Sequence, residues 1–150
     1  MAGIDTTAPV ISRHETLIDA PLRTVWELQT GIGDWPAWNP DIESVTADGP
    51  LEAGMTFDWR THGLDIRSTV QEVDAPHRIV WGGPSGGITG VHVWTFTERP
   101  GGVLVQTEES WDGEPIRANV DAMQAALDAS LVAWLGHLRT AAVGSARRSA

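Results

Sequence analysis

The stretch Val91-His92-Val93-Trp94-Thr95-Phe96-Thr97 is followed by the turn residues Pro100-Gly101-Gly102 and then by Val103-Leu104-Val105-Gln106-Thr107-Glu108-Glu109-Ser110-Trp111. Two runs rich in β-branched and aromatic residues around such a turn predict an antiparallel hairpin. Side chains alternate between the two faces of a strand, so His92, Trp94 and Phe96 share one face. One face of the hairpin is therefore bulky and aromatic and carries a histidine.

The register of this hairpin places an acid opposite the histidine. If the turn comprises residues 99–102, counting back from it pairs Glu98 with Val103, Phe96 with Val105, Trp94 with Thr107 and His92 with Glu109. A change of one residue in the turn would bring Glu108 to this position and turn the second strand over. Both registers predict a His–carboxylate pair among aromatic rings, and the choice between Glu108 and Glu109 stays open.

Length, charge and patterning narrow the class of protein. The chain has 150 residues and a net charge of −10, with 20 acidic against 10 basic residues. Binding to phosphate backbones needs a basic face, so this charge argues against nucleic acid as a partner. The first nine residues lack the basic start and the apolar run of a leader, and no segment is apolar for long enough to insert into a bilayer. We therefore expect a cytoplasmic protein without membrane insertion.

Missing residue types exclude several kinds of chemistry. The chain has no cysteine, so it has no disulfide, thiolate metal site or thiol nucleophile. It also has no lysine, which excludes a side-chain Schiff base and a phosphate loop that ends in Gly-Lys-Ser or Gly-Lys-Thr. The five histidines form no closely spaced ligand pair, and no Gly-x-Ser-x-Gly motif is present. We expect no cofactor and no metal.

The sequence on either side of the hairpin reads as further strands and short helices. A first strand is predicted at 11–18, a helix starts at Pro21 and is stopped by glycines within 31–33, and a short helical turn covers 35–40. Further strands are predicted at 42–47, 56–60, 64–73, 77–81 and 90–98, with the glycine-rich residues 82–87 as a hairpin loop. Spacing this short indicates antiparallel connections.

The last part of the chain changes from a period of two to a period of three to four. Its apolar positions are Val120, Met123, Leu127, Leu131, Trp134, Leu135 and Leu138. This pattern predicts one long amphipathic helix. A helix of about 25 residues is roughly 37 Å long, which suits a curved antiparallel sheet wrapped around it. We predict an α+β protein with the element order β-αα-β6-α.

This order of elements resembles a known family, and five stretches carry the likeness. They are Ile18-Asp19-Ala20-Pro21-Leu22-Arg23-Thr24-Val25-Trp26, Trp35-Pro36-Ala37-Trp38-Asn39-Pro40, Gly54, Val73-Asp74-Ala75-Pro76-His77-Arg78-Ile79-Val80-Trp81 and His92-Val93-Trp94-Thr95-Phe96. Together they resemble the polyketide cyclase/dehydrase and lipid-transport family of the START-like (SRPBCC) superfamily. The resemblance implies a helix-grip fold, in which a seven-stranded antiparallel curved sheet grips the C-terminal helix around a deep apolar cavity. It implies one START-like ligand-binding domain over residues 1–150, with a core of about 10–143 and flexible termini.

Strand alternation indicates which residues would line such a cavity. The candidate ligand-binding residues are Trp38, Phe57, Trp59, Ile66, Ser68, Val70, Trp81, Trp94, Phe96, Trp111, Met123 and Leu127. Eight tryptophans, two phenylalanines and no tyrosine suit a planar aromatic ligand, although tryptophans such as Trp26, Trp35 and Trp134 are also expected to fill the core. Arg60 and Arg67 either anchor an anionic group at the mouth or belong to the surface.

Three functions are compatible with these residues. The first is a protein that binds a small hydrophobic, polyketide-like molecule and catalyses its cyclisation, aromatisation or dehydration, with His92 and Glu109 as catalytic acid and base. The second is a carrier or sensor of an apolar ligand, in which the same pair has a structural or orienting role. The third is an interaction module like the co-chaperones of this superfamily, which predicts a collapsed cavity and an exposed apolar patch. The oligomeric state is not indicated.

Overall fold

A computed structural model describes residues 2–149 of the chain, with the side chain of residue 149 left aside. One antiparallel sheet has the strand order β1-β7-β6-β5-β4-β3-β2, so β1 and β2 are its edges. The strands are β1 (Val10–Ile18), β2 (Ile42–Ala47), β3 (Thr56–Thr61), β4 (Leu64–Asp74), β5 (Arg78–Ser85), β6 (Ile88–Arg99) and β7 (Gly102–Asp112). The helices are α1 (Leu22–Thr30), the 3₁₀ helix η1 (Ile32–Ala37), α2 (Glu114–Arg117) and α3 (Val120–Ser149).

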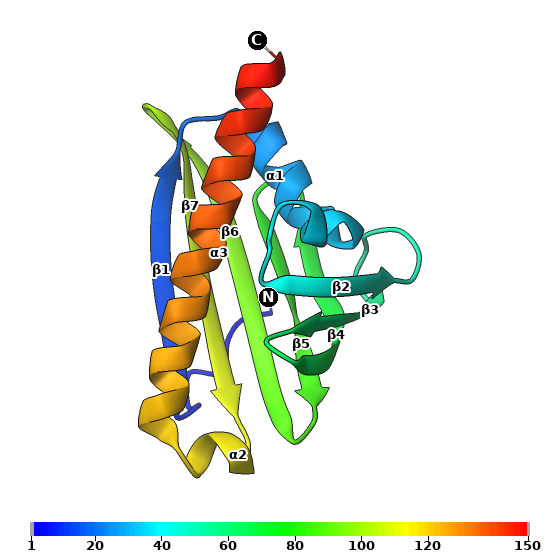
Figure 1. The fold of residues 1–150 in the computed structure, drawn as a ribbon, viewed down its shortest axis with the longest axis vertical. Helices are drawn as coiled ribbons and strands as arrows, with labels where there is room; N and C mark the ends of the chain where they lie inside the picture. The colour runs from blue at the N-terminus through cyan, green and yellow to red at the C-terminus, as the bar shows by residue number, and fades with distance from the viewer. Residues whose placement is uncertain (1, 150) are drawn as a thin grey trace.

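The long helix α3 lies across one face of the sheet, called the inner face here (Figure 1). Its buried side chains recur at helical spacing and include Leu127, Leu131, Trp134 and Leu138. Helix α1 packs beside the C-terminal half of α3, and η1 packs against β2. The predicted α+β class, the seven strands and the packing of α3 on the sheet are therefore confirmed.

The hairpin β6–β7 has the register that pairs His92 with Glu109. Arg99 pairs with Gly102, so the turn itself is Pro100–Gly101. Gly102 has φ 141°, and a Cβ atom built on it would lie 2.0 Å from the carbonyl oxygen of Ile18. Only glycine fits this close approach of β7 to the end of β1. The prediction that residues 99–102 set the register is confirmed.

Three regions differ from the prediction. The glycine-rich stretch is not all loop, because β5 continues through Gly82 and Gly83 to Ser85, and only Gly86–Gly87 form the turn before β6. Both turn glycines have positive φ, as a tight hairpin turn requires. Pro84 is tolerated because the β4 ladder ends at Gly82, which leaves this part of β5 at an edge. The short helix α2 was not predicted, and α3 is longer than expected, running through Arg147 and Arg148.

The inner face carries two apolar clusters with polar residues between them. The large cluster includes Trp26, Trp35, Phe57, Trp81, Trp94, Phe96 and Trp134. The small cluster includes Val10, Ile116, Leu127 and Leu131, with Trp111 and Met123 packed against it. Between the clusters, β1, β6 and β7 contribute a polar band that consists of Ser12, His14, His92, Thr107 and Glu109. A polar layer therefore crosses the interior of the molecule beneath α3.

The N-terminal residues cross the opposite, outer face of the sheet, and residues 2–8 are called the N-terminal strap here (Figure 1). The Ala2 N–H donates to Glu72 on β4, and the Asp5 N–H donates to the Ser110 hydroxyl on β7. Val80 on β5 and Val93 on β6 lie between these two anchors and are buried on the outer face. The strap therefore shields an apolar strip that α3 does not reach.

Candidate functional site

Aromatic rings fill the space between the inner face and α3. Trp35 from η1 lies at the centre, with its ring 5.1 Å from that of Trp134 and 5.2 Å from that of Trp81. Trp134 also contacts the rings of Trp59 and Trp94, at 5.9 and 5.4 Å. Edge-to-face and tilted pairs at these distances are favourable packing arrangements. The interior that the resemblance describes as a deep cavity is closely packed with rings in this structure.

His92 lies at the boundary between this aromatic cluster and the polar band. Its ring centroid is 5.0 Å from those of Trp81 and Trp94 and 5.5 Å from that of Trp134, and the residue is 2% exposed. The Nδ1 atom lies 3.2 Å from Oε1 of Glu109, and Nε2 lies 2.7 Å from Oγ1 of Thr107. Both ring nitrogens are therefore engaged by neighbouring strand β7.

Glu109 is the partly accessible member of the pair, with a side chain 17% exposed. Its Oε2 accepts a hydrogen bond of 2.7 Å from the indole N–H of Trp111. Burial raises the pKa of Glu109 to about 7, against the opposing effect of the Trp111 hydrogen bond. Burial lowers the pKa of His92 to about 3. A neutral imidazole therefore faces a carboxyl group that titrates near neutral pH.

The hydrogen bonds around His92 allow two arrangements that differ by one proton. When Glu109 is ionised, the Nδ1–H of His92 donates to it and the Thr107 hydroxyl donates to Nε2. When Glu109 is protonated, its O–H donates to Nδ1, the Nε2–H donates to Thr107, and the Thr107 hydroxyl turns to the carbonyl oxygen of Val93, 3.3 Å away. Protonation of Glu109 thus switches the tautomer of His92.

Three buried nitrogen atoms have no hydrogen-bond partner among the described residues: Gln29 Nε2, Trp38 Nε1 and Trp94 Nε1. All three are donors. Gln29 and Trp94 are wholly buried, and the Gln29 Oε1 accepts a hydrogen bond of 3.0 Å from Trp134 Nε1. An unpaired buried donor costs about 1–3 kcal/mol, so these groups favour an occupant that offers acceptor oxygens.

The structure divides the predicted ligand-binding residues between several places. Phe57, Trp59, Ser68, Val70, Trp81, Trp94 and Phe96 face the interior around the large cluster, and Trp38 packs against its edge. Ile66 pairs with Trp59 at the half-buried margin of β4. Trp111, Met123 and Leu127 belong instead to the small cluster, because β7 and α3 run on past the polar band before they meet α2. The two predicted catalytic residues, His92 and Glu109, are brought together.

Sequence reasoning missed several residues of the site. Trp35 and Trp134 were assigned to core packing alone, yet they lie at its centre. Thr107 could have been found, because alternation along β7 places it on the inner face with Val105 and Glu109. Gln29 and Asp128 gave no sequence signal beyond polar positions on helices, since their partners are about 100 residues away.

The sequence of this chain matches one known protein family. The model of the family described as polyketide cyclase/dehydrase and lipid transport matches residues 10–143. The chain belongs to this family. Residues 10–143 contain the whole sheet and the part of α3 that packs on it, so the match covers the elements that build the site. No curated protein sequence matches the chain.

Several solved structures share the fold of this member of the polyketide cyclase/dehydrase family. A hypothetical protein from Helicobacter pylori has a TM-score of 0.81 at 17% identity, over 95% of this chain and 97% of that one. The di-domain aromatase/cyclase BexL from the BE-7585A biosynthetic pathway has a TM-score of 0.75 at 19% identity, over 91% of this chain and 52% of that one. A Thalictrum norcoclaurine synthase mutant with a transition state analogue has a TM-score of 0.70 at 13% identity, over 90% and 94%. At these identities the likeness shows the fold alone.

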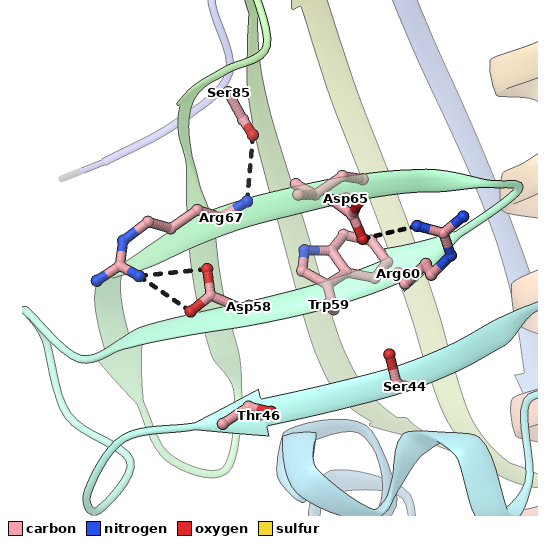
Figure 2. A pocket seen from close by; sticks show the side chains of 9 residues that line it. Ser44, Thr46, Asp58, Trp59, Arg60, Asp65, Arg67 and Ser85 are labelled. Atoms are coloured by element: carbon pink, nitrogen blue, oxygen red, sulfur yellow. Dashed lines mark hydrogen bonds and ion pairs between the residues drawn. The ribbon is translucent and has the colours of Figure 1, made fainter.

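A pocket of about 330 Å³ lies along strands β2 to β4 of this family member, and its lining includes Trp59, whose ring also contacts Trp35 and Trp134 of the aromatic cluster (Figure 2). Figure 2 shows its charged side chains paired with one another. Arg67 contacts both carboxylate oxygens of Asp58, and Arg60 contacts Asp65 and Glu43. The two arginines therefore belong to the surface, and neither anchors an anionic group at an internal site.

The described residues show neither a metal-ligand cluster nor a membrane-spanning helix. Among residues 2–149, no three His, Asp or Glu side chains lie close enough together to hold a metal ion. None of the helices described is both long enough and apolar enough to cross a bilayer.

Proposed function

We propose that this protein binds a small, oxygenated aromatic or polyketide-like molecule between the inner face of the sheet and α3. Glu109 then acts on it as acid and base in a cyclisation, aromatisation or dehydration. The observation that carries the proposal is the buried His92–Glu109 pair, set against three tryptophan rings and close to unpaired N–H donors. On this proposal residues 1–150 act as one ligand-binding domain.

The roles of the two residues differ. Both nitrogens of His92 are engaged, whereas Glu109 keeps an accessible side, so Glu109 is the group that meets a ligand. A carboxyl group with a pKa near 7 is a suitable acid and base at neutral pH. His92 is a positioning residue, because its tautomer follows the proton of Glu109. This arrangement favours catalysis over simple packing, since a core that needed only stability would avoid a buried ionisable pair.

A dehydration at this site balances without a cofactor. The Glu109 carboxylate removes a proton from a carbon next to a ligand carbonyl, and the C–H electron pair forms the new double bond. The neighbouring C–O bond breaks, and Glu109 returns its proton to the departing hydroxyl group as water. The unpaired donors Gln29 Nε2 and Trp94 Nε1 are suited to bind the carbonyl oxygens that carry the developing charge.

The second candidate is a carrier that uses the His92–Glu109 pair to orient its ligand. A third candidate, an interaction module, is favoured by the closely packed interior. The exposed apolar patch expected of such a module has little support. The large exposed apolar side chains, Leu17, Leu64 and Val132, lie on three different elements. We therefore rank ligand binding first.

The test begins with native mass spectrometry of the protein purified from its own host, followed by identification of any bound molecule. With that molecule as substrate, Glu109→Gln should lower turnover by about 100-fold or more while binding is retained. Glu108→Gln is the matched control, because Glu108 is the adjacent acid on the outer face and pairs with Arg13. Equal turnover of both variants and wild type would remove Glu109 from the chemistry. A bound ligand that no variant converts would indicate a carrier, and a co-purified polypeptide an interaction module.

A further inference from the structure

The polar band continues from Glu109 toward the protein surface through β1 and α3. We propose that Ser12, Asp128 and His14 form a proton relay between solvent and the Glu109 carboxyl group. The inference deepens the proposed function, because a ligand on the accessible side of Glu109 would leave the relay as the path between its carboxyl group and solvent. It rests, however, on hydrogen bonds and burial that are present without any ligand.

The first step of the relay lies between neighbouring strands. Ser12 on β1 is the direct partner of Glu109 on β7, and both side chains are on the inner face. Directly opposite residues of an antiparallel pair have Cβ atoms about 4.5–5.5 Å apart. Ser12 is 2% exposed, so its hydroxyl group lies inside the molecule, on the same face of the sheet as the Glu109 side chain. A rotation of the Glu109 side chain or one bridging water closes this step.

The second step crosses from the sheet to α3. The Ser12 hydroxyl donates a short hydrogen bond to Oδ1 of Asp128, and Nε2 of His14 lies 3.1 Å from the same oxygen. The Gln124 amide donates to Oδ2 of Asp128 at 3.3 Å and to the carbonyl oxygen of Ile11 at 2.8 Å, which holds the carboxylate in place. The side chains of Asp128 and His14 are 43% and 30% exposed. The path therefore runs from buried to exposed within two hydrogen bonds.

Apart from the exposed part of the Glu109 side chain itself, the other groups around Glu109 offer no equivalent exit among the described residues. His92 on β6 leads to Thr107 and then to the backbone carbonyl of Val93, where the hydrogen bonds end. Trp111 on β7 has only an indole N–H, which donates to Glu109 and accepts nothing. On β1 the facing group is Ser12, whose hydroxyl group bonds Asp128 on α3. Among the described strand neighbours of Glu109, Ser12 is thus the residue whose hydroxyl group can both accept a proton and donate one.

A proton moves along this path without net loss of charge or bonds. Protonated Glu109 passes its proton to the Ser12 oxygen as the Ser12 hydroxyl proton passes to Asp128, and solvent or His14 then takes it. Hydrogen bonds from Ser12 first, and from His14, lower the pKa of Asp128. Asp128 is therefore ionised near neutral pH, and its carboxylate can take up the proton and pass it on to solvent. Uptake of a proton follows the same steps in reverse.

The test measures proton exchange at Glu109 in the ligand-free protein. With 13C-labelled glutamate, the carboxyl resonance that Glu109→Gln removes identifies Glu109, and its exchange rate between ionised and protonated forms is measured at the midpoint of its titration. Ser12→Ala and Asp128→Asn should each slow this exchange about threefold or more, because each removes a proton acceptor from the path while direct exchange at the exposed part of Glu109 continues. Ser12→Thr keeps a hydroxyl group and should restore a rate close to wild type.

Asp121→Asn is the matched control, because it removes an exposed carboxylate from the first turn of the same helix. It should leave the exchange rate unchanged. A purely structural role of the Ser12–Asp128 contact predicts lower stability with an unchanged exchange rate, and that result would overturn the relay. If Ser12→Ala fails to fold, Asp128→Asn decides alone. Slow exchange in the variants supports the relay even if no ligand is ever converted, so the two proposals can fail separately.

Discussion

At the scale of single residues, the pair His92–Glu109 combines two opposite effects of burial. A buried carboxyl group prefers its protonated form, and a buried imidazole prefers its unprotonated form, so both members of the pair are neutral near pH 6. This is the reverse of an exposed His–acid pair, in which each charge would stabilise the other. The surrounding tryptophan rings cause the reversal, because they exclude the water that would solvate an ion pair.

The raised pKa of Glu109 predicts how stability depends on pH. Between pH 4.5 and 7 the folded protein retains a proton that the unfolded chain releases, so the Glu109 contribution falls as pH rises and is fully unfavourable above pH 7. Glu109→Gln removes this penalty while keeping an acceptor for Trp111 and a donor for His92. We expect the variant to be about 1–3 kcal/mol more stable than wild type at pH 8, measured by urea unfolding.

The same comparison at pH 4.5 or below supplies the internal control. At pH 4.5 the carboxyl group is protonated in the folded chain and half protonated in the unfolded chain, so the gain of Glu109→Gln over wild type should shrink to a few tenths of a kcal/mol and vanish at lower pH. The depressed pKa of His92 acts in the other direction, lowering stability as pH falls from 6.5 to 3, and it affects both proteins alike. A stability difference that is the same at pH 4.5 and pH 8 would mean that Glu109 titrates normally.

At the scale of elements, the outer face of the sheet depends on a segment outside the family match. The N-terminal strap is anchored to Glu72 and Ser110, and Arg78 contacts both Glu72 and the carbonyl oxygen of Ala2. Because buried Val80 and Val93 lie between the anchors, the strap acts as the cover of this strip.

Deletion of residues 2–8 should therefore destabilise the protein. Partial exposure of two valines and loss of the anchoring hydrogen bonds predict a loss of roughly 1–3 kcal/mol in the free energy of unfolding, measured by urea denaturation. Increased binding of an apolar dye should accompany it. Deletion of residues 147–150 at the other end is the matched control and should change stability less. If both deletions have the same small effect, the strap contributes nothing to the fold.

At the scale of the whole molecule, close packing of the interior has a consequence for ligand entry. The rings of Trp35, Trp81, Trp94 and Trp134 occupy the space beneath α3, so a ligand can enter only after they or α3 move. Under the proposed function, a ligand would select an open form that only a small fraction of molecules adopts. Part of the binding free energy would then offset the loss of contacts between the rings.

Ligand association should accordingly show a limiting rate. In stopped-flow tryptophan fluorescence with the ligand identified from the host, the observed rate should level off as ligand concentration rises, at the rate of opening. Trp134→Phe replaces an indole at the centre of the cluster with a smaller ring and should raise this limiting rate. Trp26→Phe is the matched control, since the Trp26 ring pairs with Phe96. A rate that stays proportional to ligand concentration in wild type would show that no opening step is needed.

Much of the fold could be predicted because local patterns express it directly. The alternation in β6 and β7 and the turn at Pro100–Gly101 set the register that joins His92 to Glu109. The apolar period from Val120 onward predicted α3. The glycine-rich end of β5 was misread, because glycine and proline usually mark loops, and only the ladder with β6 holds Gly82 to Ser85 in a strand. Pairing across strands outweighed local preference there.

The sequence by itself determined the order of elements, the faces of the strands and the pairing of a histidine with an acid, since these depend on contacts between residues near in the chain. Tertiary structure alone decided that aromatic rings close the interior and that Gln29 bonds Trp134. It also decided that Ser12 on β1 bonds Asp128 on α3, which ties the polar band to the exposed side of the helix. These features depend on how α3 lies over the sheet, and a packing angle between distant elements is set by the fit of all their side chains together.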